Sequence, residues 1–277
     1  MMTAQPLEQV PHAFDELDLV RGVLWNRRAV VCLDFDGTLA PIVDDPVAAR
    51  PAAGASGAVS RLAGHCPVVV ISGRDLVDVR ERLGVAQLWY AGSHGLEIAG
   101  PDGEHHVHEQ AVDVAPSLDA IESALAGRLD GIDGVGLERK RFSVSVHHRA
   151  VAEDDVDAVT SAVDEVVAEH TDLRVVEGRE LREIRPALEW GKGAAVTWIL
   201  ERVGLGDDAF PVYAGDDVTD EDALEVVRGA GLGIVVRNRE RLDTPTAAHL
   251  AVDDPDQLCD LLDMISELFD EWAELPT

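Results

Sequence analysis

Short apolar runs that end in Gly, Ser or Asp recur along the chain, and most are followed by a segment with helical periodicity. This alternation is typical of a mostly parallel sheet whose strands are joined by crossover helices. The predicted strands are Val30–Asp34, Pro67–Ser72, Leu88–Ala91, Pro211–Gly215, Gly233–Val236 and Leu250–Asp253. The predicted helices are Ala55–Gly64, Leu76–Leu83, Gly193–Val203 and Asp220–Arg228. The sequence therefore predicts an α/β fold.

The middle of the chain has a different pattern, which begins after the turn cluster Gly100–Gly103. Helix, strand, strand follow one another there twice, an order that favours an antiparallel sheet with helices on one face. The predicted elements are Ser117–Leu129, Val135–Lys140, Ser143–His148, Asp154–His170, Leu173–Val176 and Leu181–Ile184. We therefore predict a Rossmann-like, mostly parallel sheet core formed by residues 1–103 and 185–277. An α+β cap domain, expected to set substrate specificity, is inserted at 104–184.

The charge balance narrows the possible partners. The 277 residues carry a net charge of −30, and Lys140 and Lys192 are the only lysines. Such a surface makes nucleic acid an improbable partner. It would repel itself at low ionic strength and be screened at molar salt, which predicts a halophile with a salt-rich cytoplasm. A lysine-poor genomic bias is an alternative explanation for part of this composition.

Other features exclude several protein classes. No apolar run approaches the roughly 20 residues that span a bilayer, and Met1 to Phe14 lacks a basic region followed by an apolar one. We expect a cytoplasmic protein with no membrane partner. Cys32, Cys66 and Cys259 lie far apart without metal-ligand spacing, so we expect all three to be small buried hydrophobic residues.

The final stretch, Asp253 to Thr277, has nine acidic residues and no basic ones. Its apolar residues nevertheless keep helical spacing: Leu258, Leu261, Leu262, Ile265, Leu268 and Trp272. This pattern predicts a docked amphipathic helix whose acidic residues form a solvated face.

The strand Val30–Asp34 ends in a pair of carboxylates, Asp34 and Asp36. Residues two apart on an extended chain point the same way, and ligands of open α/β sheets bind beyond the carboxyl ends of the strands. Two adjacent carboxylates repel each other and suit a hard cation such as Mg²⁺. The following Gly37-Thr38 allows a tight turn whose N–H groups face an anion. We interpret the segment as a phosphotransfer site; a strand followed by an acidic turn is the alternative.

Two further segments offer groups that could hold a phosphate. The second predicted strand ends in Ser72-Gly73, whose hydroxyl and N–H could bind a phosphate oxygen, although Ser-Gly after a strand is often only a turn. Lys192 opens a predicted helix and could bring a compact positive charge to the phosphate. A lone lysine is usually solvated, but a chain with so few lysines makes a function for Lys192 the stronger hypothesis.

The predicted strand Pro211–Gly215 is followed by a third group of carboxylates. Asp216 is the candidate metal ligand at the same sheet edge as Asp34. Asp217 and Asp220 are candidates for supporting positions behind the ligands or for the cap of the next helix. Because acidic residues are abundant, an accidental cluster is the alternative.

The four motifs, in the order Asp-x-Asp-Gly-Thr, Ser-Gly, Lys and Gly-Asp-Asp, resemble those of the haloacid dehalogenase superfamily of phosphohydrolases. Further segments are similar to the trehalose-6-phosphate phosphatase family, over about residues 29 to 236. They are Gly92-Ser-His-Gly95, Lys140-Arg-Phe-Ser143, His147-His-Arg149, Glu183-Ile-Arg-Pro186 and Gly215-Asp-Asp-Val-Thr-Asp-Glu-Asp222.

The resemblance implies a role for each matching residue of the core. Asp34 would be the nucleophile that forms an aspartyl phosphate. Asp36 would protonate the departing sugar oxygen and then deprotonate the attacking water. Mg²⁺ would be bound by Asp34, the Asp36 carbonyl and Asp216. Ser72, Gly73 and Lys192 would hold the phosphoryl group.

The resemblance also implies that the cap binds the sugar. The matching positions are Glu138, Lys140, His147, Arg149 and Glu183. A site that pairs several hydroxyls rejects sugars that lack them, because its buried polar groups would go unsatisfied. Two departures from the family pattern occur: His148 stands where tyrosine is common, and Arg179 where lysine is common.

The implied activity is Mg²⁺-dependent hydrolysis of trehalose 6-phosphate, a sugar phosphate, with a trehalose-phosphate synthase as a potential partner. One alternative is a related phosphatase acting on sucrose 6-phosphate or mannosyl-3-phosphoglycerate. A second is a non-catalytic sugar-phosphate sensor, because related folds can lose chemistry and keep binding.

Overall fold

The protein is described from a computed structural model that covers residues 4–43, 45–178, 180–238 and 241–275. The chain folds into two compact units. The first, called the core unit, comprises Met1–His106 and Trp190–Thr277; the second, called the cap unit, comprises Val107–Glu189. No helix in the described part of the chain is both long and apolar enough to cross a membrane.

The core unit is built on an eight-stranded sheet in the order β14-β12-β11-β2-β3-β4-β5-β6. The strands β14 to β4 pair in parallel, and β5 turns back antiparallel to β4. In chain order the strands are β2 (Arg28–Asp34), β3 (Val68–Ile71), β4 (Trp89–Gly92), β5 (Glu97–Ala99), β6 (His105–Val107), β11 (Ala209–Gly215), β12 (Leu232–Val236) and β14 (Leu250–Val252). The predicted mostly parallel sheet is confirmed.

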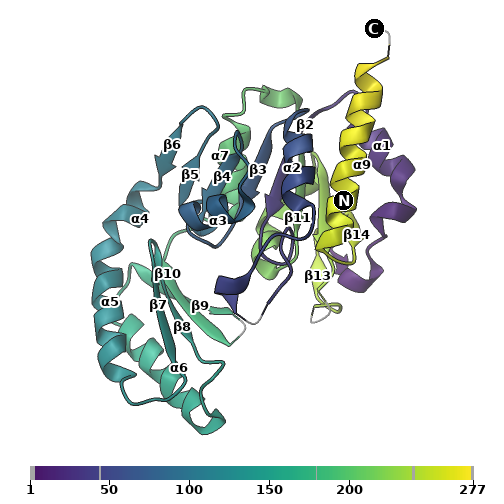
Figure 1. Cartoon of the computed structure of the whole chain (residues 1–277). Helices are drawn as coiled ribbons and strands as arrows, with labels where there is room; N and C mark the ends of the chain where they lie inside the picture. Colours follow the sequence, from purple (N-terminus) through teal and green to yellow (C-terminus); the bar gives the residue numbers. More distant parts are fainter. Residues whose placement is uncertain (1–3, 44, 179, 239–240, 276–277) are drawn as a thin grey trace. The chain divides into compact units, whose positions relative to one another are not determined.

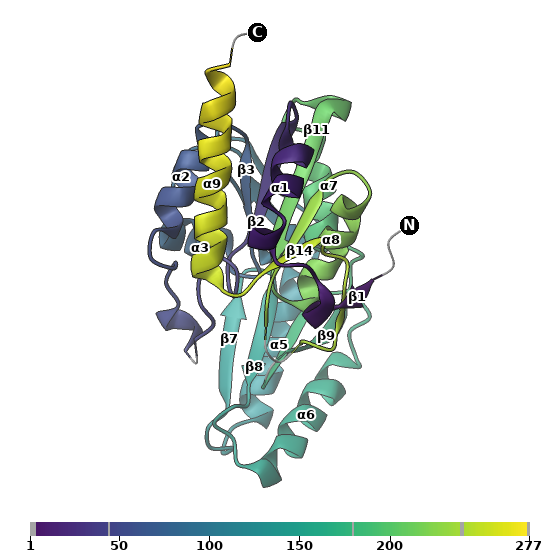
Figure 2. The same cartoon turned by 90° about the vertical axis from the view of Figure 1, so that its right-hand side faces the viewer.

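Helices cover both faces of this sheet (Figures 1 and 2). Successive strand residues alternate between two apolar clusters, so that Val31 and Leu33 pack on one side and Val30 and Cys32 on the other. The helices α1 (Leu17–Leu24), α2 (Ala55–Ala63), α3 (Leu76–Leu83) and α9 (Pro255–Ala273) contribute to the first cluster. The helices α7 (Lys192–Leu200) and α8 (Glu221–Arg228) contribute to the second.

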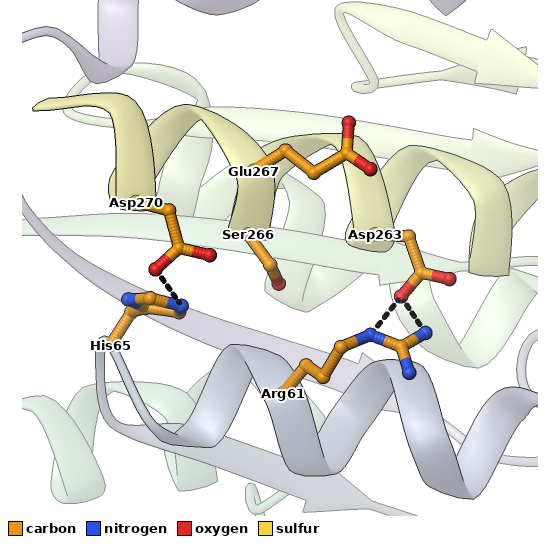
Figure 3. Close-up of a pocket in the computed structure, with 6 residues that line it drawn as sticks. All are labelled: Arg61, His65, Asp263, Ser266, Glu267 and Asp270. Carbon is orange, nitrogen blue, oxygen red and sulfur yellow. Dashed lines mark hydrogen bonds and ion pairs between the residues drawn. The ribbon is translucent and has the colours of Figure 1, made fainter.

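The predicted C-terminal amphipathic helix is confirmed as α9, which begins at an Asp254 cap and buries its leucines against the sheet. Its acidic face is solvated as predicted, because the acidic residues of α9 are exposed apart from the half-buried Asp263. Figure 3 shows Asp263 with Arg61 and Asp270 with His65, both partners lying on or just after α2. These pairs offset part of the negative charge beside α2, while the buried leucines hold the helix to the core.

The core unit also contains a two-stranded sheet and several short 3-10 helices. The strand β1 (Gln5–Pro6) pairs antiparallel with β13 (Pro245–Thr246). The short 3-10 helices are η1 (Leu7–Gln9), η2 (Ala13–Asp15), η3 (Pro46–Ala48), η4 (Ser93–Gly95), η5 (Gly206–Asp208) and η6 (Val218–Asp220).

Cys32 and Cys259 are buried as predicted, whereas the prediction for Cys66 is wrong, since it is only partly buried at the edge of the core.

The cap unit contains a four-stranded antiparallel sheet in the order β7-β8-β10-β9. Its strands are β7 (Gly136–Lys140), β8 (Ser143–His147), β9 (Leu173–Gly178) and β10 (Leu181–Pro186). Its helices are α4 (Glu109–Asp113), α5 (Ala115–Arg128) and α6 (Glu153–Val167). Apolar residues of α5 and α6 pack with Val144, Val146 and Ile184 in one cluster, so the helices cover one face of the sheet.

Candidate active site

The strand ends of the core unit bring Asp34 and Asp216 together. The strand β2 lies between β3 and β11, with Leu33 opposite Ala214, so Asp34 and the residue after β11 reach the same sheet edge. Gly37, in the turn after β2, has φ +81°, and a Cβ atom there would collide with the Asp216 carboxylate. The turn therefore requires glycine both for its backbone conformation and for the close approach of Asp216.

Lys192 joins two buried carboxylates. Its Nζ donates to Asp34 Oδ1 at 2.7 Å and to Asp220 Oδ1 at 2.7 Å. The side chains of Lys192, Asp34 and Asp220 are 4%, 5% and 0% exposed, so all three charges lie away from bulk water. A buried charge is tolerated when it is paired and hydrogen-bonded, as each of these is.

Asp220 uses both of its oxygens within the protein. Tyr213 donates its hydroxyl to Oδ1 at 2.5 Å, beside Lys192, and the backbone N–H groups of Asp216 and Asp217 donate to Oδ2. Asp217 and Asp220 also form a capping box across η6, and Asp220 is the residue before α8. Asp220 therefore orients Lys192 and the Asp216 backbone.

The electrostatics of the cluster follow from burial and from mutual repulsion. Burial raises the pKa of Asp34 to about 7, against the opposing effect of Lys192. Burial and the neighbouring Asp34 charge raise the pKa of Asp216 well above its usual range. Burial also acts on Asp220, but contacts with Lys192 outweigh it and lower the pKa of Asp220. Despite burial, Asp220 and Asp34 raise the pKa of Lys192, so the lysine stays protonated.

The same cluster has the composition of a cation site. Asp34, Asp216 and Asp220 each offer a carboxylate oxygen, and these three atoms lie within 4.8 Å of one another. Each Asp220 oxygen already accepts two hydrogen bonds, whereas each Asp34 oxygen accepts one, so Asp34 and Asp216 are the better ligand candidates. Asp34 and Asp216 are buried close together, and Lys192 supplies one positive charge to a group of three carboxylates. A hard divalent cation would balance the remaining negative charge. A divalent metal is implied by this donor set and by the family described below.

Ser72 and Gly73 lie at the end of β3, next to β2 in the sheet. The Ser72 side chain is buried, and its Oγ accepts a hydrogen bond from the N–H of Arg74 at 3.1 Å. A Cβ atom on Gly73 would meet the ring of His94. The structure thus places the Ser72 hydroxyl and the Gly73 backbone directly after the strand that neighbours β2.

Asp36 is not part of the three-carboxylate group. Its carboxylate pairs with Arg74, Oδ2 with Nε at 2.7 Å and Oδ1 with Nη2 at 2.6 Å. A second partner of Asp34 is Thr38, whose hydroxyl donates to Oδ2 at 3.2 Å. The sequence predicted a tight turn at Thr38 but not its hydrogen bond to Asp34, and it gave no role to Arg74, which directly follows Ser72-Gly73.

The five cap residues predicted to bind sugar lie on or next to three strands of the cap sheet. Glu138 and Lys140 are on β7, His147 is on β8 and Glu183 is on β10. Glu138 and Glu183 both lie opposite Ser145 in the register, so the three residues form one row across the sheet. Alternate residues of a strand share a face. This row therefore lies on one face of the sheet, and the apolar Val144 and Val146 lie on the other face.

Contacts among the cap residues are mixed in length. Lys140 Nζ lies 3.9 Å from Glu138 Oε2 and 3.9 Å from Glu183 Oε1, while His147 Nε2 is 3.1 Å from Glu138 Oε2. Arg149 pairs instead with Glu180 at 2.7 Å. Ser145 is fully buried and its Oγ has no hydrogen-bond partner among the described residues, a feature that the sequence did not reveal. Arg179 lies outside the described residues.

Solved structures with this fold define its class. A haloacid dehalogenase-like hydrolase from Bacteroides thetaiotaomicron aligns with a TM-score of 0.61 at 15% identity, over 86% of this chain and 100% of its own. The C-terminal domain of a Candida albicans trehalose-6-phosphate phosphatase aligns with a TM-score of 0.75 at 22% identity, over 93% and 98%. The fold is therefore that of haloacid dehalogenase-like hydrolases, in which a core of this kind carries a cap domain.

Sequence comparison identifies the particular family. The trehalose-phosphatase family model matches residues 32–256. A trehalose-phosphate phosphatase of Mycobacterium avium is 46% identical over 266 residues, which cover 94% of this chain and 68% of the relative. One of Mycobacterium tuberculosis is 43% identical over 262 residues, which cover 94% and 66%. The chain belongs to the trehalose-phosphatase family, as its motifs predicted, and it spans about two thirds of these relatives' length.

Proposed function

We propose that this chain is a phosphoric monoester hydrolase that converts trehalose 6-phosphate to trehalose and phosphate, a step of trehalose biosynthesis. The observation that carries the proposal is the buried Asp34, held by Lys192 and Thr38 beside Asp216 at the strand edge. Membership in the trehalose-phosphatase family supports the choice of substrate.

We assign the chemistry of the proposed reaction to two carboxylates. An Asp34 oxygen attacks phosphorus while the bond from phosphorus to the sugar oxygen breaks, and Asp36 gives its proton to the departing oxygen. Asp36 then takes a proton from water as the water oxygen attacks phosphorus; the bond from phosphorus to Asp34 breaks, which releases phosphate and restores the Asp34 carboxylate. Lys192 orients Asp34 for the first step and opposes the rise of its pKa on burial, as the short Nζ–Oδ1 contact supports.

Magnesium is the proposed metal, held by Asp34, the backbone carbonyl of Asp36 and Asp216. The donor set supports this choice, because Mg²⁺ prefers oxygen ligands and commonly uses one or two carboxylates. When bound, the metal would supply positive charge to the crowded phosphoryl oxygens. Asp217 and Asp220 would support the ligand loop through the hydrogen bonds that close η6.

The proposed phosphate-binding residues are Ser72, Gly73 and Lys192. Ser72 and Gly73 offer a hydroxyl and a backbone N–H on the strand next to Asp34. The buried Lys192 ammonium already pairs with two carboxylates. It can also attract a phosphoryl group as long as it remains protonated.

For the sugar we propose Glu138, Lys140, His147, Arg149 and Glu183. The shared sheet face of Glu138, Lys140, His147 and Glu183 supports a hydroxyl-binding surface. Carboxylates and ammonium groups at 3.9 Å from one another are close enough to interact and loose enough to accept a ligand hydroxyl. A trehalose-phosphate synthase is the proposed source of the substrate.

The test is phosphate release by the purified chain from trehalose 6-phosphate with Mg²⁺, at low and at molar salt. Sucrose 6-phosphate and mannosyl-3-phosphoglycerate are assayed in parallel. We expect trehalose 6-phosphate to have the highest kcat/KM. A higher value for another ester would replace the substrate, and no release from any of them would refute the hydrolase.

Asp34→Asn separates an enzyme from a sensor. The amide cannot form the aspartyl phosphate, so phosphate release should fall by several powers of ten while binding of the sugar phosphate, measured by calorimetry, persists. Asp217→Asn is the matched control, since it removes an exposed charge outside the three-carboxylate group, while the amide oxygen can still accept the backbone N–H that closes η6. It should retain most of the activity.

A further inference from the structure

Arg74 makes a two-pronged contact with the proposed proton donor. Its Nε and Nη2 each donate to a different oxygen of Asp36, at 2.7 and 2.6 Å. This fork geometry is the most directional contact that a carboxylate can make with a cation. Each carboxylate oxygen has a second lone pair, so the contact fixes the plane of the carboxylate and leaves acceptor positions open for a proton.

Arg74 is itself held in place on three sides. Nη1 donates to Asp78 at 3.0 Å, Nη2 also donates to the carbonyl of Pro46 at 2.9 Å, and the guanidinium lies 5.7 Å from the ring centroid of Phe35. The side chain of Arg74 is 13% exposed, whereas that of Asp36 is 43% exposed. The arginine is therefore the fixed member of the pair, and Asp36 is the member that a ligand can reach.

A second arginine completes this support without touching Asp36. Arg82 pairs with Asp78 at 2.8 Å and donates to the carbonyls of Val47 and Ala49. Although burial opposes the shift, Arg82 and Arg74 together lower the pKa of Asp78. Asp78 is thus a fixed anion between two arginines, and it anchors Arg74 from the side away from Asp36.

We infer that Arg74 is a positioning residue for proton transfer, which orients the Asp36 carboxyl toward the leaving group through the two-pronged contact. The inference rests on the proposed function, in which Asp36 protonates the departing oxygen. Without the fork the carboxyl samples several rotamers, and only a fraction of encounters place its proton on that oxygen. The loss should depend on how much the leaving group needs a proton.

The experiment compares kcat/KM of the wild type, Arg74→Gln and Arg74→Lys on a series of phenyl phosphates whose leaving groups differ in pKa, and on trehalose 6-phosphate. The ratio kcat/KM covers the steps up to departure of the leaving group. We expect Arg74→Gln to lose about 10- to 100-fold on poor leaving groups, a part of what general acid catalysis contributes, and less than about 3-fold on p-nitrophenyl phosphate. Lysine keeps the charge but not the fork, so it should restore little.

Arg82→Gln is the matched control, because it removes one of the two arginines on Asp78 but leaves Arg74 bonded both to Asp78 and to Asp36. Its dependence on the leaving group should match that of the wild type. Equal losses of Arg74→Gln on all esters, or a gain on poor leaving groups, would overturn the inference. A wild type that cleaves the phenyl series but not trehalose 6-phosphate would overturn the proposed substrate instead, and the series would still decide the role of Arg74. No cleavage of any ester would overturn both.

Discussion

The only two lysines of the chain occupy opposite kinds of surroundings. Lys192, in the core unit, is 4% exposed and bonds to two carboxylates at 2.7 Å. Lys140, in the cap unit, is 22% exposed and stands between two carboxylates at 3.9 Å. Each ammonium faces two acids, but only the first is locked by short hydrogen bonds.

This difference in burial indicates different roles for the two lysines. A buried triad with short contacts has one arrangement, which suits a step where atoms must be held in line. A looser, partly hydrated group can exchange a neighbour for a ligand hydroxyl at little cost, since exposed ion pairs contribute little to stability. We therefore expect Lys192 to govern stability and turnover, and Lys140 to govern substrate affinity.

The largest expected effect is that of Lys192→Met. The variant leaves Asp34 and Asp220 buried without their shared cation, and breaking a buried ion pair in this way costs about 3–5 kcal/mol of unfolding free energy. Urea unfolding followed by circular dichroism measures the loss. Turnover should fall below detection, because Asp34 loses the group that orients it.

Lys140→Met is the counterpart in the cap and should cost no more than about 1 kcal/mol of unfolding free energy. Similar losses for the two variants would show that burial does not distinguish the two lysines. Lys192→Arg tests the size of the cation. The site of the Lys192 ammonium is almost fully covered, so the larger guanidinium does not fit there.

The next effect concerns the metal. If Mg²⁺ is the metal of the site and binds the folded state only, it should raise the unfolding free energy by about 2.7 kcal/mol at a concentration 100 times its Kd. Asp216→Asn removes a proposed ligand and should abolish this stabilisation, measured as the shift of Tm on adding Mg²⁺ or EDTA. Asp217→Asn should keep the shift. If both variants keep it, the ion is not held at Asp216.

The sequence predicted the elements that strand periodicity controls. Asp34, Ser72 and Asp216 each follow an apolar run, and parallel strands bring such positions to one edge of the sheet. The cap sheet was predictable for a related reason, because alternation along β7 and β8 separates a polar from an apolar face.

The sequence could not show which side chains meet across long separations. Arg74 and Asp36 are 38 residues apart, and any of several arginines could have been the partner of Asp36. Asp220 was a candidate cap for the next helix; it precedes α8, but its side chain makes no cap hydrogen bond there and instead closes η6. Its contacts with Lys192 and Tyr213 depend on how α7 packs against α8. Ser145 reads as an ordinary strand serine until its burial is known.

A smaller effect separates affinity from turnover at Lys140. If this lysine binds a sugar hydroxyl, Lys140→Met should raise KM for trehalose 6-phosphate by about 10-fold, a typical loss for one charged hydrogen bond. The value of kcat should stay within about 2-fold, because the interaction is the same in the ground and transition states. Lys140→Met should leave hydrolysis of p-nitrophenyl phosphate unchanged. A fall in kcat on both esters would instead give Lys140 a part in the chemistry.

The smallest effect is the response of the two lysines to salt. Raising NaCl from 0.01 to 1 M shortens the Debye length from about 30 to about 3 Å, which screens exposed charges far more than buried ones. The cost of Lys140→Met in unfolding free energy should fall from about 0.5 kcal/mol toward zero, while that of Lys192→Met should change little. Unfolding of the wild type and both variants in parallel at each salt concentration gives the two differences directly. If salt erased the cost of Lys192→Met as well, the Asp34–Lys192–Asp220 cluster would be open to solvent, and its rigidity could not be the source of its role.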